Sequence, residues 1–407
     1  MAIVIPKLLQ ETYRKNKDDI RALICATYPA FVYRNVPAVP ASQIPVFALH
    51  SVNLDQFERR IQHISQNGYK TLTSDEIYDV LAGNRPPEEN NIALTFDDGC
   101  RSLWSIVYPL LKKHGLKATA FVVSGAVPNS SSMGCNLEDV WSGKASLADL
   151  RNEENEEPLC NWDELAAMQT NGTIDIQSHT SFHSSVFTTN EIIGFVSPSM
   201  NIGFLASDYN PMLIQSGKSV WATYVEPGSP IYQYDSNMRA KTRFLEDEEL
   251  TEFCVNFVRN NGSDRFFLKP GWKSQLLHEV KDYRARYGDK GHYQADSERE
   301  ADIRRDLRDS KELIESKLGN NVRHLCYPWY LGSEKAARIS GSLGFVTNHW
   351  GILPGRAVNR VGDDPLAIAR IDEEYIHSLP GIGRLSLRTI LADKVMRLTV
   401  NRVRSRR

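Results

Sequence analysis

The chain has 407 residues, and its 48 lysines and arginines nearly balance its 50 aspartates and glutamates. This balance provides no broad positive field, so we expect no nucleic-acid partner. No stretch approaches about eighteen consecutive apolar residues, and the first residues lack a charged segment followed by a long apolar one. We therefore expect a cytoplasmic protein without a transmembrane segment.

The first 100 residues predict a helical lead-in followed by alternating strands and helices. Residues 1–43 carry apolar residues at helical spacing, and prolines then interrupt the pattern. A strand over 44–49 ends in His50, a position that suits a site residue or a packing residue equally well. The alternation that follows favours parallel strands joined by crossover helices.

Residues 91–99, Asn-Ile-Ala-Leu-Thr-Phe-Asp-Asp-Gly, read as a buried strand that runs into two carboxylates and a glycine. Neighbouring side chains on a strand point to opposite faces, so Asp97 and Asp98 cannot both enter one apolar layer. Gly99 permits a sharp turn at the strand end, where active sites of α/β proteins gather. Taken alone, such a cluster is more typical of an ordinary strand-ending turn than of an active site.

A second polar group follows the predicted strand over 174–178. His179 and His183 are four residues apart, so one turn of chain can aim both rings at a single point. Two imidazoles and one carboxylate form a three-ligand site for a divalent metal ion, with one position left for water. Iron(II) oxygenases use the same donor types, but the adjacent second aspartate disfavours that interpretation.

These residues resemble a known family. Thr-Phe-Asp-Asp-Gly at 95–99 and His-Thr-Ser-Phe-His at 179–183 are similar to the first two motifs of the polysaccharide deacetylase (NodB-homology) family. The resemblance continues, in the family's order, through 57–81, 116–124, 161–172 and 310–330. It implies an α/β fold, a distorted, incomplete (β/α) barrel, here with a large insertion. It also implies metal-dependent removal of acetyl groups from an N-acetylated sugar in a glycan or glycan precursor.

The resemblance also implies roles for the residues of both motifs. Asp98, His179 and His183 are expected to hold a divalent metal ion, with zinc as the expected metal and cobalt, nickel or manganese as alternatives. Asp97 is expected to be the base, although the residues alone do not separate the roles of the two aspartates. Thr180 is expected to orient the ligand loop through its hydroxyl.

Residues 326–330, Cys-Tyr-Pro-Trp-Tyr, are similar to the family's third motif but depart from it at two positions, because Trp329 also stands where the family has a tyrosine after the proline. A cysteine stands where the family usually has an arginine that orients the catalytic aspartate. We expect Tyr327, Pro328 and Trp329 to form a wall of the substrate cleft. We also hypothesise, from position alone, that Arg370 reaches the aspartate in place of the missing arginine.

The general acid is the remaining catalytic group. The family usually supplies a late histidine that follows an apolar residue, and His377 after Ile376 fits this pattern best. His349 is the competing candidate. For either histidine, a packed or exposed role without chemistry is an equal alternative.

We divide the chain into a helical lead-in (1–43), the first part of the barrel (44–183), an inserted cap-like subdomain (184–296) and the second part of the barrel with a C-terminal helix (297–407). The insertion is rich in aromatic residues, including Trp221, Tyr224, Tyr232, Phe244 and Phe266. These rings either contact sugar or form the subdomain's own core, and the core is favoured because aromatic side chains dominate core burial.

The expected partner is an acetylated carbohydrate. Because no export signal is visible, we expect a cytosolic or inner-leaflet intermediate, and a lipid-linked substrate would bring the protein to the membrane surface. Two alternatives remain open. The missing arginine suggests a non-catalytic carbohydrate-binding relative, and the same water attack would serve an O-acetyl esterase on a polysaccharide.

Overall fold

The computed structural model describes residues 17–130, 132–198, 212–215, 218–221 and 226–404. In this part of the chain the largest sheet has eight strands, in the order β14-β13-β6-β5-β4-β2-β16 with β3 paired to β4. All of its pairings are parallel. The strands are β2 (Val46–Leu49), β3 (Lys70–Leu72), β4 (Asn91–Phe96), β5 (Ala118–Val122), β6 (Ile174–Ser178), β13 (His324–Cys326), β14 (Thr347–His349) and β16 (Ile371–Asp372).

The two ends of this strand order come together. Ile368, just before β16, donates its N–H to the carbonyl of Asn348 at 2.9 Å, and Trp350 donates its N–H to the carbonyl of Ile368 at 2.8 Å. These two bonds join the chain before β16 to the end of β14, so the sheet curls almost into a ring. The predicted distorted, incomplete (β/α) barrel is confirmed.

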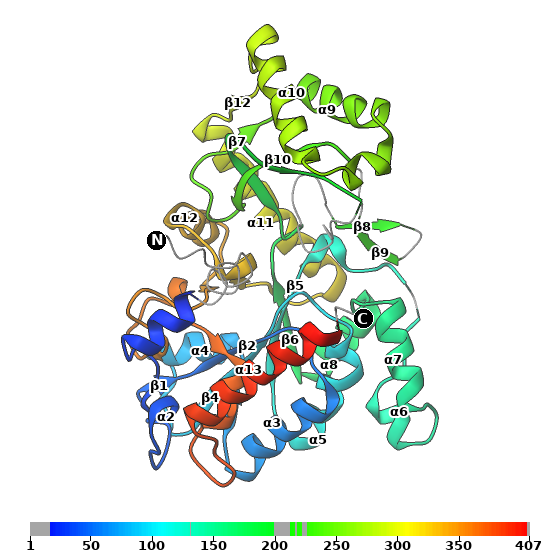
Figure 1. Ribbon diagram of the computed structural model, residues 1–407. Helices are drawn as coiled ribbons and strands as arrows, with labels where there is room; N and C mark the ends of the chain where they lie inside the picture. The colour runs from blue at the N-terminus through cyan, green and yellow to red at the C-terminus, as the bar shows by residue number, and fades with distance from the viewer. Residues whose placement is uncertain (1–16, 131, 199–211, 216–217, 222–225, 405–407) are drawn as a thin grey trace.

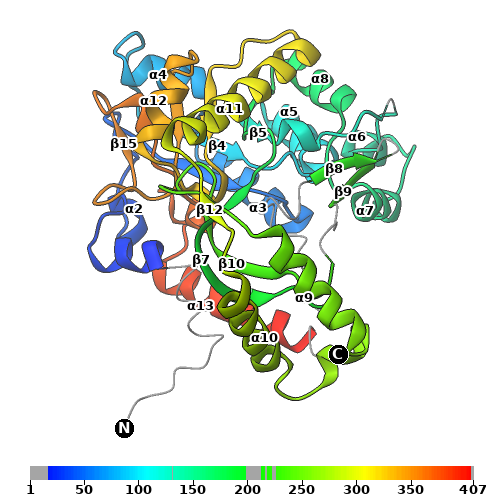
Figure 2. The same ribbon diagram turned by 90° about the horizontal axis from the view of Figure 1, so that it is seen from above.

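Helices surround the curled sheet on its outer side (Figures 1 and 2). Every residue of β4 is buried, as expected for a strand that is covered on both faces. The helix starts follow the sequence, because Thr73 with Glu76 and Asn161 with Glu164 form capping boxes. The flanking helices are α3 (Leu54–Gln66), α4 (Ser74–Leu81), α5 (Tyr108–His114), α8 (Trp162–Asn171), α11 (Asp296–Leu318) and α12 (Glu334–Ser342).

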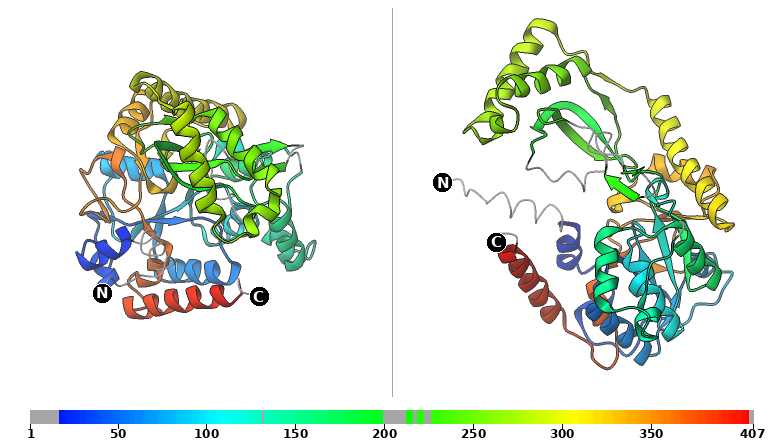
Figure 3. Two further views of the ribbon diagram at one scale, coloured as in Figure 1. Left: turned by 45° about the horizontal axis from the view of Figure 1, so that its top comes forward. Right: turned by 90° about the vertical axis from the view of Figure 1, so that its right-hand side faces the viewer.

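The insertion projects from the barrel and has a core of its own (Figure 3). Tyr232, Phe244 and Phe266 are buried in that core, as the core interpretation predicts, whereas Tyr224 lies outside the described residues. The side chain of Trp221 is not described. The subdomain contains the antiparallel pairs β7 (Ser185–Phe195) with β10 (Pro230–Ser236), β8 (Met212–Gln215) with β9 (Lys218–Trp221), and β11 (Phe244–Leu245) with β12 (His292–Tyr293), and the helices α9 (Glu248–Asn260), η3 (Ser263–Leu268) and α10 (Trp272–Tyr287).

The remaining elements are short, apart from the last helix. Of the lead-in, residues 1–16 lie outside the described part, and the helical prediction holds for residues 17–24 and for α2 (Ala30–Tyr33). Among the described helices, none combines the length and apolarity that crossing a membrane requires. The short elements and the last helix are β1 (Gln43–Ile44), η1 (Leu103–Val107), η2 (Ser124–Ala126), α6 (Leu137–Trp141), α7 (Leu147–Glu156), η4 (Pro328–Tyr330), β15 (Asn359–Arg360), η5 (Pro365–Ala367), η6 (Glu373–Ser378) and α13 (Leu387–Arg404).

Candidate metal centre and active site

The two adjacent aspartates leave the end of β4 in different directions. The Asp97 N–H still donates to the carbonyl of Leu49 on β2, at 2.9 Å, so Asp97 continues the sheet and is buried. Asp98 and Gly99 have φ angles of 71° and 77°, in the left-handed region. A side chain on Gly99 would place its Cβ 3.2 Å from Val122 Cγ1. The turn therefore separates the two carboxylates, as the sequence predicts.

The two histidines are presented by a tight loop after β6. The His179 N–H donates to the carbonyl of Val122 at 2.9 Å, which keeps this residue in register with β5. Thr180 and His183 then adopt φ angles of 68° and 52°. The Thr180 hydroxyl accepts the His183 N–H at 3.1 Å, so this hydroxyl closes the loop that carries both rings.

Three donor atoms from the predicted ligands lie close together. The Nε2 atoms of His179 and His183 are 3.4 and 3.5 Å from Asp98 Oδ1. His179 Nδ1 lies 2.9 Å from the carbonyl oxygen of Cys326, so the N–H is at Nδ1 and Nε2 is left as a donor to metal. A tetrahedral zinc ion with bonds of about 2.0–2.1 Å separates its donors by about 3.4 Å. The residues therefore fit a small divalent cation.

The electrostatics of two of these ligands suit metal binding. Burial raises the pKa of Asp98, but its hydrogen bond with His179 and the nearby imidazoles outweigh burial and hold the pKa at about 2. Burial lowers the pKa of His183 to about 4. An ionised carboxylate and a neutral imidazole are the forms that bind a metal ion.

Asp97 is held by Arg370. The guanidinium donates to both carboxylate oxygens, at 2.7 and 2.8 Å, and also to the carbonyl of Trp350 and the hydroxyl of Thr95. Burial favours a raised pKa for Asp97, but the charge of Arg370 outweighs it and holds the pKa well below its usual range. The structure thus places Arg370 where the positional hypothesis expects it.

Cys326, in the position of the family's arginine, also lies beside Asp97, with Sγ 3.6 Å from Asp97 Oδ1. Of the predicted cleft wall, only Trp329 reaches the site, where its ring packs on His183 at a centroid distance of 4.2 Å. The expectation for Tyr327 and Pro328 is wrong because both are buried. The Tyr327 hydroxyl accepts from Asn348 Nδ2 at 2.9 Å, inside the barrel.

Tyr330, rather than Tyr327, is the tyrosine of the third motif that lies beside the site, near His50 and Arg370. Trp329 and Tyr330 have φ angles of 53° and 64°, and this reversal turns both rings outward. The Arg370 guanidinium lies 4.9 Å from the Tyr330 ring centroid. Two consecutive side-chain-bearing residues in the left-handed region are unusual, and local sequence gives no signal for them.

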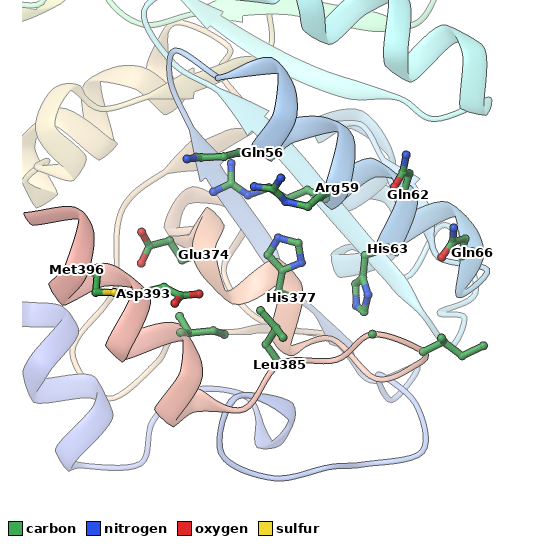
Figure 4. A pocket seen from close by; sticks show the side chains of 14 residues that line it. Gln56, Arg59, Gln62, His63, Gln66, Glu374, His377, Leu385, Asp393 and Met396 are labelled. Atoms are coloured by element: carbon green, nitrogen blue, oxygen red, sulfur yellow. The ribbon is translucent and has the colours of Figure 1, made fainter. Parts of the chain in front are cut away.

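His377 does not lie with the metal donors. It is part of η6, and its ring is 5.9 Å from that of His63 on α3. Figure 4 shows it among side chains of α3 and α13, where it lines a cavity of about 520 Å³. The residues that line this cavity do not include the two aspartates and two histidines of the first two motifs, Asp97, Asp98, His179 and His183. The prediction of His377 as general acid is therefore wrong: η6 turns this residue to the outer flank of the barrel.

His349 is also unsuitable as a general acid. It is fully buried, its Nε2 lies 3.1 Å from Ser74 Oγ, and burial lowers its pKa well below the usual value. His50 faces the site instead. Its Nε2 is 3.9 Å from Asp97 Oδ2, and its side chain is 46% exposed. The signal was its place at the end of β2, which pairs with β4 in the sheet.

Comparison with known proteins agrees with this geometry. Residues 84–196 match the family model described as polysaccharide deacetylase. YxkH of Bacillus subtilis, classed as a polysaccharide deacetylase, is 30% identical over 122 residues, which are 28% of this chain and 39% of that protein. Poly-beta-1,6-N-acetyl-D-glucosamine N-deacetylase of Staphylococcus aureus is 33% identical over 79 residues, which are 19% of this chain and 27% of that enzyme.

Among solved structures, the BpsB deacetylase domain from Bordetella bronchiseptica aligns with a TM-score of 0.47 and 17% identity, covering 82% of this chain and 96% of that one. The matches to the two curated relatives span less than half of each relative's length. The matched segment contains β4, β5 and β6 with both aspartates and both histidines. Through this segment, the chain is similar to the polysaccharide deacetylase family.

Proposed function

We propose that this protein is a metal-dependent N-deacetylase that removes acetyl groups from an N-acetylated sugar in a glycan or glycan precursor. The observation that carries the proposal is the convergence of Asp98, His179 and His183, with donor separations of 3.4 and 3.5 Å, beside a second buried aspartate. The similarity to an N-deacetylase of poly-N-acetylglucosamine supports this substrate class.

The three ligands would hold a zinc ion, which supplies a Lewis acid for the amide carbonyl and lowers the pKa of bound water. Asp97 is the base in this proposal. Arg370 keeps its carboxylate ionised and fixes both oxygens, so the carboxylate can accept the proton that the attacking water loses.

His50 is the proposed general acid. The leaving amine needs a proton, and His50 is the imidazole beside Asp97 that remains partly open to solvent. Trp329 and Tyr330 would then offer aromatic faces to the sugar ring.

This geometry removes the reason for considering a non-catalytic carbohydrate-binding protein. That alternative rested on the missing third-motif arginine, and Arg370, just before β16, donates two hydrogen bonds to Asp97. The amide and ester alternatives differ only in the leaving group. They are separated by experiment.

The test is acetate release by the purified full chain from N-acetylglucosamine oligomers and, in a separate arm, from an O-acetylated oligosaccharide. We expect release from the N-acetylated substrate, loss of release after chelation and recovery when zinc or cobalt is restored. The Asp98→Asn variant serves as the inactive control. Absence of acetate release from N-acetylated oligomers by the metal-restored protein would contradict the proposal, and release only from the ester would favour an O-acetyl esterase.

A further inference from the structure

Helix α11 buries a polar stripe on the face that it turns toward the histidine loop. Arg299, Asp306 and Ser310 lie on one side of the helix and are all buried, among the apolar residues Ile303 and Leu307. Charged side chains are almost never buried without partners, because desolvation costs free energy that only specific contacts offset. The stripe therefore requires partners.

The first partner is the histidine loop. Asp306 Oδ1 accepts the Ser181 N–H at 2.7 Å, and the Asp306 carbonyl accepts the Ser181 hydroxyl at 2.9 Å. Ser181 is midway between the two predicted histidine ligands. One turn further along α11, the Ser310 hydroxyl lies 2.8 Å from that of Ser178, whose oxygen accepts the Thr180 N–H at 3.2 Å. The helix thus holds the loop at two successive points.

The loop needs such support because of its backbone. Thr180 and His183 both carry side chains in the left-handed region, a conformation that is costly unless the surroundings fix it. A loop free to relax would move the imidazoles away from Asp98. The contacts from α11 are therefore placed where they oppose this relaxation.

The second partner belongs to the insertion. Asp306 Oδ2 accepts from Asn237 Nδ2 at 3.2 Å, just after β10. The Asn237 N–H donates to the carbonyl of Ser184, which follows the second histidine. Arg299 fixes the orientation of the Asn237 amide, because its guanidinium donates to Asn237 Oδ1 at 2.5 Å. One carboxylate therefore joins the histidine loop, α11 and the insertion, and Figure 3 shows α11 running between the insertion and the barrel.

We propose that Asp306 is the positioning residue of the histidine loop: by binding Ser181 and Asn237 together, it keeps the imidazoles of His179 and His183 facing Asp98. This role rests on the proposed function, since the ligand geometry matters only if the site holds a metal ion. Partners one shell outside metal ligands commonly change metal affinity 10–100-fold when removed.

The test compares Asp306→Asn with Asp309→Asn in the full chain. The first substitution keeps the size of the side chain but replaces one acceptor by an N–H donor. Arg299 prevents the Asn237 amide from flipping, so Asn237 still presents its NH₂ group to residue 306. The NH₂ group of the new asparagine must then face either this NH₂ group or the Ser181 N–H, and one of the two hydrogen bonds is lost. Asp309 is the matched control on the same helix, with a side chain that is 48% exposed and paired with Arg308.

Zinc affinity is measured by competition with a chelator, and the absorption spectrum of the cobalt-loaded protein reports the ligand geometry. We expect Asp306→Asn to bind zinc about 10–100-fold more weakly and to alter the cobalt spectrum, with Asp309→Asn unchanged. Adding Asn237→Asp to Asp306→Asn exchanges donor and acceptor and preserves the total charge. This double variant is expected to regain zinc affinity to within about threefold, which a merely structural role would not predict.

Wild-type zinc affinity in Asp306→Asn, or a double variant no better than the single one, would overturn the inference. If Asp306→Asn does not fold, Asn237→Ala replaces it, and unchanged zinc affinity in that variant counts against the inference equally. Zinc binding and acetate release separate the two proposals. Weakened zinc binding in a protein that releases no acetate defeats the deacetylase proposal alone, whereas acetate release with unchanged zinc binding in Asp306→Asn defeats only the positioning role.

Discussion

Arg370 donates two parallel hydrogen bonds to Asp97, across 273 positions of sequence. Both side chains are buried, and the guanidinium lies between the carboxylate and the carbonyl of Trp350. A bidentate pair of this kind fixes the orientation of the carboxylate as well as its charge. Arg370 therefore connects Asp97, the proposed base, to the segment around Trp350 where the two ends of the sheet meet.

Replacing this arginine tests the link. Arg370→Ala leaves the Asp97 charge buried without its partner, which we expect to lower the free energy of unfolding by about 3–5 kcal/mol. Acetate release should fall at least as strongly as it does in Arg370→Lys, which keeps the charge but loses the bidentate geometry. Denaturant unfolding and acetate assays measure both effects, with the exposed Arg308→Ala as control. Full activity in Arg370→Ala would dispose of the orienting role.

The two candidate acids are separated by a matched pair of substitutions. We expect His50→Gln to lower turnover by about 10²–10⁴-fold, because it removes the group that protonates the leaving amine. His377→Gln, on the outer flank of the barrel, should stay within about twofold of the wild type. Zinc affinity should be unchanged in both variants. Loss of turnover in His377→Gln with normal activity in His50→Gln would reverse the assignment.

The three proposed metal ligands can be tested without a measurement of turnover. His183→Gln removes one nitrogen donor from the three-residue set, so we expect zinc affinity to fall by more than about 100-fold. Calorimetric titration of the metal-free protein measures this change. His377→Gln provides the histidine control, and equal zinc affinity in the two variants would mean that the ion binds elsewhere.

Trp329 offers a test of substrate contact. Its ring packs on His183 and is half-buried, so Trp329→Ala should raise the KM for N-acetylated oligomers about tenfold through loss of a stacking face. The matched control is Trp141→Ala, a tryptophan that is 48% exposed on α6. An unchanged KM with reduced zinc affinity would show that the ring supports the ligand rather than the sugar.

His349 predicts how stability depends on pH. Burial, and then the charge of Arg370, lower its folded-state pKa well below 6.5, and its Nδ1 finds no hydrogen-bond partner among the described residues. Below pH 6.5, His349 is therefore protonated in the unfolded chain but stays neutral in the folded chain until its lower folded-state pKa is reached. The contribution of His349 to the free energy of unfolding is complete above pH 6.5. Below that pH it declines, by up to about 1.4 kcal/mol per pH unit.

In His349→Gln, the free energy of unfolding should decline less steeply below pH 6.5 than in the wild type, because glutamine does not titrate. Unfolding by denaturant between pH 4.5 and 7.5, with chelator present, measures the difference between variant and wild type. His278→Gln, on the exposed surface of α10, is the control. Parallel pH profiles for His349→Gln and the wild type would contradict the expected burial of a neutral imidazole.

The sequence alone determined the parts of this site that lie within single strand ends. Asp97 with Asp98, and His179 with His183, each follow a buried strand directly, and the apolar pattern of the strand and the turn chemistry that follows it are local properties. The strand and helix alternation likewise predicted parallel strands with crossover helices, and the family resemblance implied the barrel. The aromatic content of the insertion correctly indicated a core.

Only the tertiary structure decided which distant residues complete the site. Arg370 reaches Asp97, His50 faces it and Asp306 holds the histidine loop, whereas His377 turns away and Tyr327 is buried. Local patterns place a residue at a strand end or on a helix face, but its neighbours depend on how the sheet curls and closes. That curvature results from contacts between segments far apart in sequence, which no local spacing encodes.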